Sequence, residues 1–194
     1  MENGNAVADV LLGKVNPSGK LPVTFPVRLE DSPAYINASY PGCRDVNYGE
    51  GIFVGYRYYD QKDVTPLFPF GHGLSYTSFT YTELKITKKV KAGGKVEVSL
   101  CVTNSGRVLG KEVVQLYVSD LKSSLPRPPK ELKGFAKVSL APWESETVTF
   151  TLDERALSYY DPHKKAWVAE PGEFEVLVGS SSRDIRMKGK VVLE

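Results

Sequence analysis

Alternation of apolar and polar residues governs the second half of this chain and restricts that half to a β-sheet fold. The clearest rows occupy positions 96–102, 114–118, 148–152 and 174–178, and Leu84 and Ile86 begin a further one. Successive side chains of a strand point to opposite faces, so each row places its apolar members on one face. A helical period is absent from this part of the sequence.

Turn residues separate these rows at regular intervals. Gly93-Gly94, Asn104-Ser105-Gly106 and Glu170-Pro171-Gly172 have the composition of tight turns. About seven short strands in such a span are typical of two packed antiparallel sheets. We therefore predict an immunoglobulin-like or fibronectin type III-like β-sandwich over residues 77–194.

Composition excludes several classes of protein. The chain has 194 residues, of which 41% are hydrophobic and 25% are charged, and its formal net charge is +2. The lysines and arginines are spread along the sequence, so no basic stripe predicts nucleic-acid binding. No apolar run approaches the roughly 18 residues of a membrane-spanning helix. We expect a globular chain with neither a nucleic acid nor a membrane as its partner.

A short amphipathic helix is predicted at the start of the chain, over residues 3–12. Val7, Val10 and Leu11 recur at helical spacing, Asn3 or Asn5 is available as the N-cap, and Gly13 follows as a C′ residue. A helix of about ten residues is marginal alone in water. Since no nearby segment supplies a surface for it, we expect its apolar side chains to be exposed here or pressed loosely on the sandwich, and its partner to lie in missing sequence.

Residues 16–76 read as a turn followed by connecting segments. Asn16-Pro17-Ser18-Gly19 is a turn, and the prolines of residues 20–26 suit an extended connector or an edge strand. Residues 27–49 lack a period and are expected to form an ordered loop. Residues 51–60 are rich in aromatic side chains and are predicted to form a strand. Together with residues 66–76 they are predicted to form an apolar bridge, interrupted by turns, between the two parts of the chain.

No set of residues completes a catalytic constellation. Glu50 is the best single candidate for an acid or base, but hydrolysis of a glycosidic bond needs two carboxyl groups. We expect its carboxylate to bond nearby backbone or an arginine. His72 and His163, the two histidines, lack a ligand pattern, and His72 is expected in a tight turn. No catalytic, cofactor-binding or metal-binding residue is predicted.

The cysteines and tryptophans are assigned structural roles. Cys43 and Cys101 are too few for a disulfide framework and are predicted to be free thiols, with Cys101 on the outward phase of its strand. Trp143 and Trp167 are expected to pack at the edge of the core. Asn37-Ala38-Ser39 is a glycosylation sequon, which favours a secretory route without deciding the compartment.

Several motifs, in a consistent order, resemble glycoside hydrolase family 3. Residues 4–22 (GNAVADVLLG and NPSGKLP) are similar to the last helix and exit of the family's second catalytic-region domain. Residues 50–60 and 68–76 (FPFGHGLSY) resemble the connector of its β-glucosidase-type members. The motifs KEVVQLYV, KELKGF and GEFEVLVGSSSRDI resemble its C-terminal fibronectin type III-like domain.

The resemblance implies a division into three parts: residues 1–26, the remnant of an α/β-sandwich domain; residues 27–76, a connector; and residues 77–194, the fibronectin type III-like sandwich. In the family, an aspartate nucleophile and a glutamate acid/base perform retaining hydrolysis. Both lie in motifs that precede the matched segments, so Met1 is expected to be internal to a longer protein.

The implied parent hydrolyses terminal β-linked glucose, or a similar sugar such as xylose, from glycosides or oligosaccharides. The implied partners of this chain are the parent's missing catalytic domains, which the sandwich would brace while remaining inactive alone. The proline-stiffened loop at 121–129 is the candidate for bordering the substrate entrance.

Two other readings remain open. A free-standing sandwich could bind carbohydrate or a protein partner, as fibronectin-like modules do. A small independent hydrolase that uses Glu50 would need a second carboxylate, for which the sequence provides no candidate.

Overall fold

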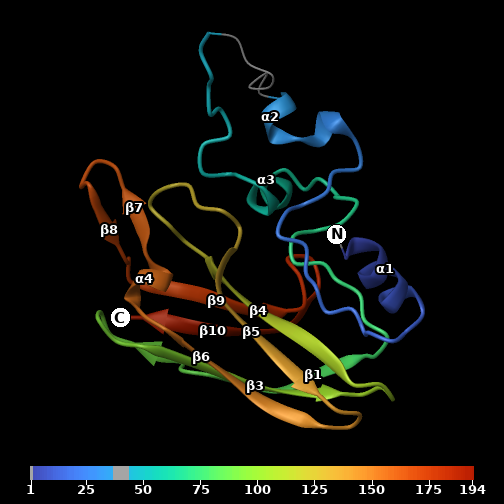
Figure 1. The fold of residues 1–194 in the computed structure, drawn as a ribbon. Helices are drawn as coiled ribbons and strands as arrows, with labels where there is room; N and C mark the ends of the chain where they lie inside the picture. Colours follow the sequence, from blue (N-terminus) through green and yellow to red (C-terminus); the bar gives the residue numbers. More distant parts are fainter. Residues whose placement is uncertain (1, 37–43) are drawn as a thin grey trace.

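The computed structural model describes residues 2–36 and 44–194 of the chain. Cys43 and the sequon at Asn37 lie outside the described residues. Of the described helices, none is long and apolar enough to cross a membrane. The segments before the sandwich contain α1 (Asn3–Leu11), the 3-10 helix η1 (Leu29–Asp31), α2 (Pro33–Ile36) and α3 (Tyr56–Gln61). Figure 1 shows these segments together on one side of the strands.

The predicted β-sandwich is confirmed. The strands are β1 (Phe79–Ile86), β2 (Lys89–Val90), β3 (Val96–Asn104), β4 (Gly110–Asp120), β5 (Glu131–Leu140), β6 (Ser145–Leu152), β7 (Tyr159–Asp161), β8 (Ala166–Val168), β9 (Gly172–Gly179) and β10 (Ile185–Leu193). One sheet has the order β1-β3-β6 and the other the order β2-β10-β9-β4-β5, with β7 and β8 as a separate hairpin. The short helix α4 (Glu154–Leu157) lies between β6 and β7.

The predicted N-terminal helix is confirmed, but its N-cap assignment is wrong. Glu2 is the N-cap residue of α1, and Asn5 instead donates a hydrogen bond from Nδ2 to Glu2 Oε2 at 2.6 Å. Gly13 follows the helix with φ +73°, as a C′ residue should. None of the residues of α1 is buried. The expected exposure is confirmed for Val7 and Leu11, whereas Val10 is half-buried.

The strand predicted at residues 51–60 is wrong, because this segment turns and then forms α3. Gly55 precedes the helix with φ +58°, and Tyr58 and Tyr59 are buried. Aromatic residues favour strands in general, but here packing of the two rings against the rest of the chain decides the local structure. Residues 20–26 bend at Pro22 and Val23 and form one isolated bridge, between Phe25 and Phe68.

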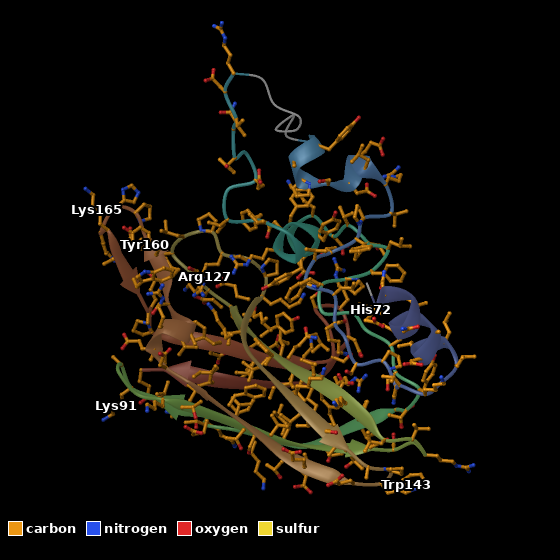
Figure 2. All side chains as sticks on the ribbon, viewed as in Figure 1. His72, Lys91, Arg127, Trp143, Tyr160 and Lys165 are labelled. Carbon is orange, nitrogen blue, oxygen red and sulfur yellow. The ribbon has the colours of Figure 1, made fainter. Side chains whose placement is uncertain are left out.

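The predicted packing of the two tryptophans at the core edge is wrong. Trp143 is 67% exposed in the turn between β5 and β6, far from Tyr160 on the β7–β8 hairpin (Figure 2). Trp167 lies on that hairpin and is half exposed. The guanidinium of Arg155 lies over its ring, 3.2 Å from the ring centroid. Neither indole belongs to the core because both occupy connections outside the two sheets.

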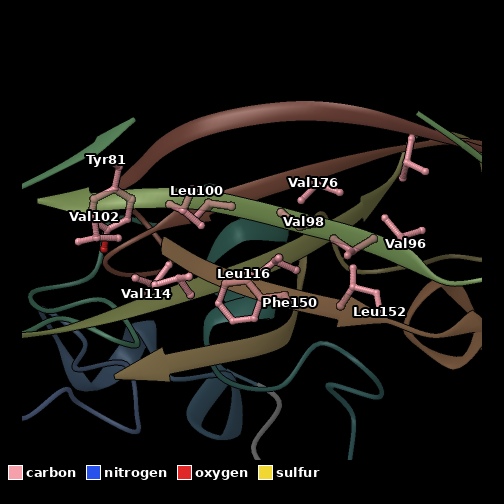
Figure 3. Packing of buried hydrophobic residues seen from close by; sticks show 14 of the residues in the cluster. Tyr81, Val96, Val98, Leu100, Val102, Val114, Leu116, Phe150, Leu152 and Val176 are labelled. Carbon is pink, nitrogen blue, oxygen red and sulfur yellow. The ribbon is translucent and has the colours of Figure 1, made fainter. Parts of the chain in front are cut away.

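The core forms between the two sheets from the predicted rows. Val96, Val98, Leu100 and Val102 of β3 are all buried, whereas Cys101 is partly exposed on the opposite face. Figure 3 shows Leu100 and Phe150 from one sheet approaching Leu116 and Val176 from the other. The face of β4 that points away from this core carries Gln115 and Tyr117, and both of these side chains are also buried. The segments before the sandwich cover that second face.

Candidate functional site

Glu50 does not have the hydrogen bonds that its sequence context led us to expect. Its Oε2 is buried without a hydrogen-bond partner in the part of the chain that the structure describes. The backbone carbonyl of Glu50 accepts a hydrogen bond from the Phe53 amide at 3.0 Å, which fixes the turn before α3. For Oε2, the predicted bond to backbone or to an arginine is therefore wrong.

The two histidines occupy turns that are far apart. The His72 amide donates to the Pro69 carbonyl at 3.1 Å, and the imidazole stacks on Phe68, so the predicted tight turn is confirmed. His163 lies in the β7–β8 turn and donates its amide to Asp161 Oδ1. Within residues 2–36 and 44–194, no group of His, Cys, Asp and Glu side chains is arranged to hold a metal ion.

Buried polar contacts gather instead where the N-terminal segments meet the outer face of β4 and β9. Gln115, nearly fully buried on β4, donates from Nε2 to the Gly71 carbonyl at 3.1 Å and to the Ser180 carbonyl at 2.6 Å. Its Oε1 accepts a hydrogen bond from the Tyr117 hydroxyl at 2.6 Å. Burial raises the pKa of that hydroxyl, so it remains protonated and acts as a donor.

Gly71 must be a glycine for this contact to form. Its φ is +80°, and a Cβ built on it would lie 2.1 Å from Gln115 Oε1. A Cβ at Gly73 would lie 2.3 Å from the Gly19 carbonyl oxygen. The Gly71-His72-Gly73 motif therefore allows the bridge at 66–76 to approach both β4 and the turn that follows α1.

Aromatic rings extend the contact toward α3. The Tyr56 ring stacks on Phe70, with the ring centroids 4.9 Å apart, and meets Tyr117 edge to face at 5.9 Å. The Tyr56 hydroxyl accepts a hydrogen bond from the Leu132 amide of β5 at 2.8 Å. The three rings thus pack against one another, and the hydroxyls of Tyr56 and Tyr117 both have hydrogen-bond partners.

A buried ion-pair cluster fixes the end of α3. The Asp60 side chain, which is 5% exposed, forms ion pairs with Lys130 and with Arg183 Nε, the latter at 2.9 Å. Arg183 also donates to the Tyr59 carbonyl at 3.0 Å. The neighbouring Ser182 donates its amide to the Phe70 carbonyl at 2.9 Å. Residues 180–183 of the sandwich therefore hold both α3 and the bridge.

Two polar side chains tie the segment after α1 to the sandwich. Lys20 pairs with the nearly buried Glu112 at 2.9 Å. Asn16 donates from Nδ2 to the Leu109 carbonyl at 2.9 Å, and its Oδ1 accepts a hydrogen bond from the Tyr76 amide at 2.8 Å. We call the contact formed by Gly71, Gln115, Tyr56, Asp60 and these two side chains the seam.

The opposite side of the N-terminal segments is apolar and exposed. Leu11 of α1 and Leu12, its C-cap residue, are 75% and 72% exposed, and most of the large hydrophobic side chains exposed in the described residues precede Thr77. Pro17, Leu21, Phe25, Phe68 and Leu74 line a shallow hollow on the same segments. Large apolar side chains left exposed in such numbers are typical of an interaction site. We call Leu11, Leu12 and the apolar lining of this hollow the apolar face.

A second ion-pair network lies at the base of the loop at 121–129. Arg127 bonds Asp120 at 3.0 Å and Glu131 at 2.9 Å, and Arg57 of α3 pairs with Glu131 at 3.1 Å. Burial raises the pKa of Glu131, but its hydrogen bond to Arg127 and the positive charges of Lys133, Arg57 and Arg127 outweigh burial, so the net pKa lies below its ordinary 4.5.

This network gives a prediction for the pH dependence of stability. A carboxylate whose folded pKa is depressed stabilises the fold above its unfolded pKa, and that stabilisation is lost as the pH falls through the folded pKa. We expect Glu131→Gln to lower the free energy of unfolding at pH 7 and to flatten its decline between about pH 5 and pH 3. Urea unfolding across that range measures both effects. The matched control is Glu146→Gln, at an exposed glutamate of β6; equal pH profiles for the two variants would contradict the prediction.

The proline-stiffened loop singled out in the sequence forms one wall of a groove. The groove has a volume of about 560 Å³, and its other walls are Phe53 and the β7–β8 hairpin with Tyr160 and Trp167. Arg127, labelled in Figure 2, and Glu131 also line the groove, and their charges are already paired with each other. That this loop borders a substrate entrance stays a prediction.

Sequence reasoning missed the seam for an identifiable reason. Alternation assigns Gln115 and Tyr117 to the outward face of β4, where the sequence alone gives no covering element. Two features of the sequence could have indicated the seam. Gln115 and Tyr117 are an amide and a large aromatic ring flanked by valines and a leucine, and glycines lie close together at positions 71 and 73.

Comparison with known proteins gives consistent matches along the chain. Residues 1–76 match the glycosyl hydrolase family 3 C-terminal domain, and residues 112–182 match the fibronectin type III-like domain. Thermostable beta-glucosidase B of Acetivibrio thermocellus is 58% identical over 190 residues, which are 97% of this chain and 25% of that protein. Beta-glucosidase BoGH3A of Bacteroides ovatus is 50% identical over 195 residues, which are 98% of this chain and 26% of that protein.

Solved structures agree with these matches. The crystal structure of the Bifidobacterium adolescentis GH3 beta-glucosidase superimposes with a TM-score of 0.92 at 46% identity, over 98% of this chain and 28% of that one. Beta-glucosidase 3B of Thermotoga neapolitana, solved in complex with α-D-glucose, gives a TM-score of 0.90 at 43% identity, over 98% of this chain and 26% of that one. The chain thus spans about a quarter of the length of the curated relatives it matches.

Proposed function

This chain belongs to glycosyl hydrolase family 3, whose C-terminal region it matches, and from that membership we propose that it stabilises the catalytic domains of a β-glucosidase. The apolar face carries this proposal. Burying one large aliphatic side chain is worth roughly 1.5–3 kcal/mol, and Leu11 and Leu12 alone present two that are almost fully exposed. Catalytic domains of the kind that its relatives carry would cover this face.

In this proposal the three segments have separate roles. Residues 1–26 belong to the catalytic part, residues 27–76 form the connector, and residues 77–194 form the sandwich that braces it. The seam supports the second role, because Gly71, Tyr56 and Asp60 fix the connector to β4 and to residues 180–183 at several points. A connector held in this way would transmit the rigidity of the sandwich to the apolar face.

The chemistry of the whole protein is proposed to be the hydrolysis of terminal β-linked glucose or a similar sugar, with both working carboxylates outside this chain. We expect no hydrolysis of an aryl β-glucoside by the purified chain, because retaining and inverting mechanisms both need two carboxyl groups across the bond. Release of the chromophore measures this. Turnover that survives purification, scales with chain concentration and is lost in Glu50→Gln would contradict it.

The bracing role is tested in a joined protein, defined as Thermostable beta-glucosidase B with its matching quarter replaced by this chain. The half-life of its aryl β-glucosidase activity near the unfolding temperature should approach that of the natural relative. The relative lacking that quarter should lose activity much faster. Equal half-lives with and without the chain would contradict the proposal.

A carbohydrate-binding role for the sandwich has one observation in its favour, the half-exposed rings of Tyr160 and Trp167 beside the groove. Titration of the chain with cello-oligosaccharides while tryptophan fluorescence is recorded would test it, and a saturable change would favour it. Arg155 already occupies one face of Trp167, which leaves less of that ring for stacking on a sugar.

A further inference from the structure

Trp143 occupies a backbone conformation that a bulky residue adopts only at a cost. Its φ is +66° in the β5–β6 turn, and its side chain is 67% exposed, so packing within this chain does not compensate that cost. Glycine would adopt this conformation without strain. An exposed tryptophan at such a position points to a contact outside the described residues.

The turn that presents Trp143 is rigid because Asn104 holds it. Asn104 is fully buried, and its carbonyl accepts a hydrogen bond from the Trp143 amide at 2.9 Å. Its Nδ2 donates to the Val108 carbonyl at 2.8 Å and to the Leu140 carbonyl at 3.0 Å. One asparagine thus fixes the β5–β6 turn and the β3–β4 loop relative to each other, and that loop exposes the side chains of Val108 and Leu109.

The β3–β4 loop is in turn attached to the segment after α1. Asn16 donates to the Leu109 carbonyl, and the Tyr76 amide donates to Asn16 Oδ1. The Tyr76 hydroxyl then donates to the Val10 carbonyl of α1 at 2.8 Å. A series of hydrogen bonds therefore connects the turn at Trp143 with helix α1, which ends at Leu11 and is followed by Leu12. We call Val108, Leu109 and Trp143 the end patch.

We propose that the end patch docks on the catalytic domain that covers α1, so that the sandwich itself contacts that domain in addition to the connector. This inference rests on the proposed function. Three side chains, of which a tryptophan can bury about 150–250 Å², supply less than the roughly 800 Å² per partner of a stable dimer. Joined to α1 by the hydrogen bonds of Asn16 and Tyr76, they would add to that interface an aromatic anchor of the type that dominates interface energetics.

Hydroxyl-radical footprinting of the isolated chain and of the joined protein tests the contact directly. Oxidation of Trp143 and Leu109 is expected to fall several-fold in the joined protein, together with oxidation of Leu11 and Leu12. Protection of α1 without protection of Trp143 would overturn this inference and leave the proposed function standing. If α1 stays unprotected in the joined protein, the proposed function fails as well. Concentration-dependent protection in the isolated chain would assign the patch to a second copy and overturn the inference.

Trp143→Gly provides a second test, because its two expected effects have opposite signs. Loss of backbone strain should raise the unfolding midpoint of the isolated chain by about 2–4 °C. In the joined protein the same substitution should restore oxidation of Val108 and Leu109 and lower the midpoint. The matched control is Lys165→Gly, which relieves the same kind of strain (φ +50°) at the opposite end of the molecule and should raise both midpoints. An equal rise for Trp143→Gly in both proteins would overturn the inference.

Discussion

Asp60→Ala is expected to lower the free energy of unfolding of this chain by about 3–5 kcal/mol. The carboxylate lies between Lys130 and Arg183, and its removal leaves the nearly buried Lys130 without its counter-charge. Arg183 is one third exposed and keeps its hydrogen bonds to the Tyr59 and Val64 carbonyls. Removing one partner of a buried ion pair costs far more than the intact pair contributes, because the remaining charge, here that of Lys130, stays desolvated. The loss should appear in the main urea transition if the connector and the sandwich unfold together.

The matched control for this variant is Glu173→Ala. Glu173 pairs with Lys190 at 2.9 Å, but both side chains are more than half exposed, and such pairs contribute at most about 1 kcal/mol. A transition shifted strongly by Asp60→Ala and hardly by Glu173→Ala is the expected result. Equal shifts would mean that the seam does not hold the connector to the sandwich.

Gly71→Ala is expected to destabilise the chain by about 2–4 kcal/mol, through two effects that add. A left-handed backbone costs about 1 kcal/mol with alanine, and the new Cβ would lie 2.1 Å from Gln115 Oε1. Gln115 cannot move without breaking its bond to the Tyr117 hydroxyl, and an unpaired buried polar group costs about 1–3 kcal/mol. Thermal or urea unfolding of the purified variant measures the sum.

Gly13→Ala separates the two effects. Gly13 has φ +73°, and no atom lies within 4 Å of the position that its Cβ would take. This variant should therefore show the backbone strain alone, about 1 kcal/mol. If the two alanine variants lose the same stability, close contact between Gly71 and Gln115 does not contribute to the seam.

The parts of the fold that could be predicted are those decided locally. The row at 96–102 needs only an apolar face on one side of a strand, and the structure buries Val98 and Leu100 as expected. The helix over Asn3–Leu11 and its exposed face followed from spacing alone. Both depend on periodicity within one segment, which the sequence contains.

The parts that could not be predicted depend on contacts between distant segments. Tyr58 and Tyr59 have side chains that suit a strand, but their burial against the rest of the chain makes the segment helical. Gln115 acquires its role only when Gly71 lies against β4, 44 residues away in sequence. Trp143 resembled a core residue because its size favours burial, whereas its exposure follows from a turn that Asn104 holds.

Hydrogen exchange of the amides of α1 tests the central claim most directly, since the claim is that this helix lacks its partner in the isolated chain. Measured in the isolated chain, these amides should exchange nearly as fast as in an unfolded peptide, while those of β3 and β4 stay protected. In the joined protein the same α1 amides should become protected to a level comparable with the strands. Slow exchange of α1 in the isolated chain, equal to that of β3 and β4, would contradict the claim that catalytic domains complete its fold.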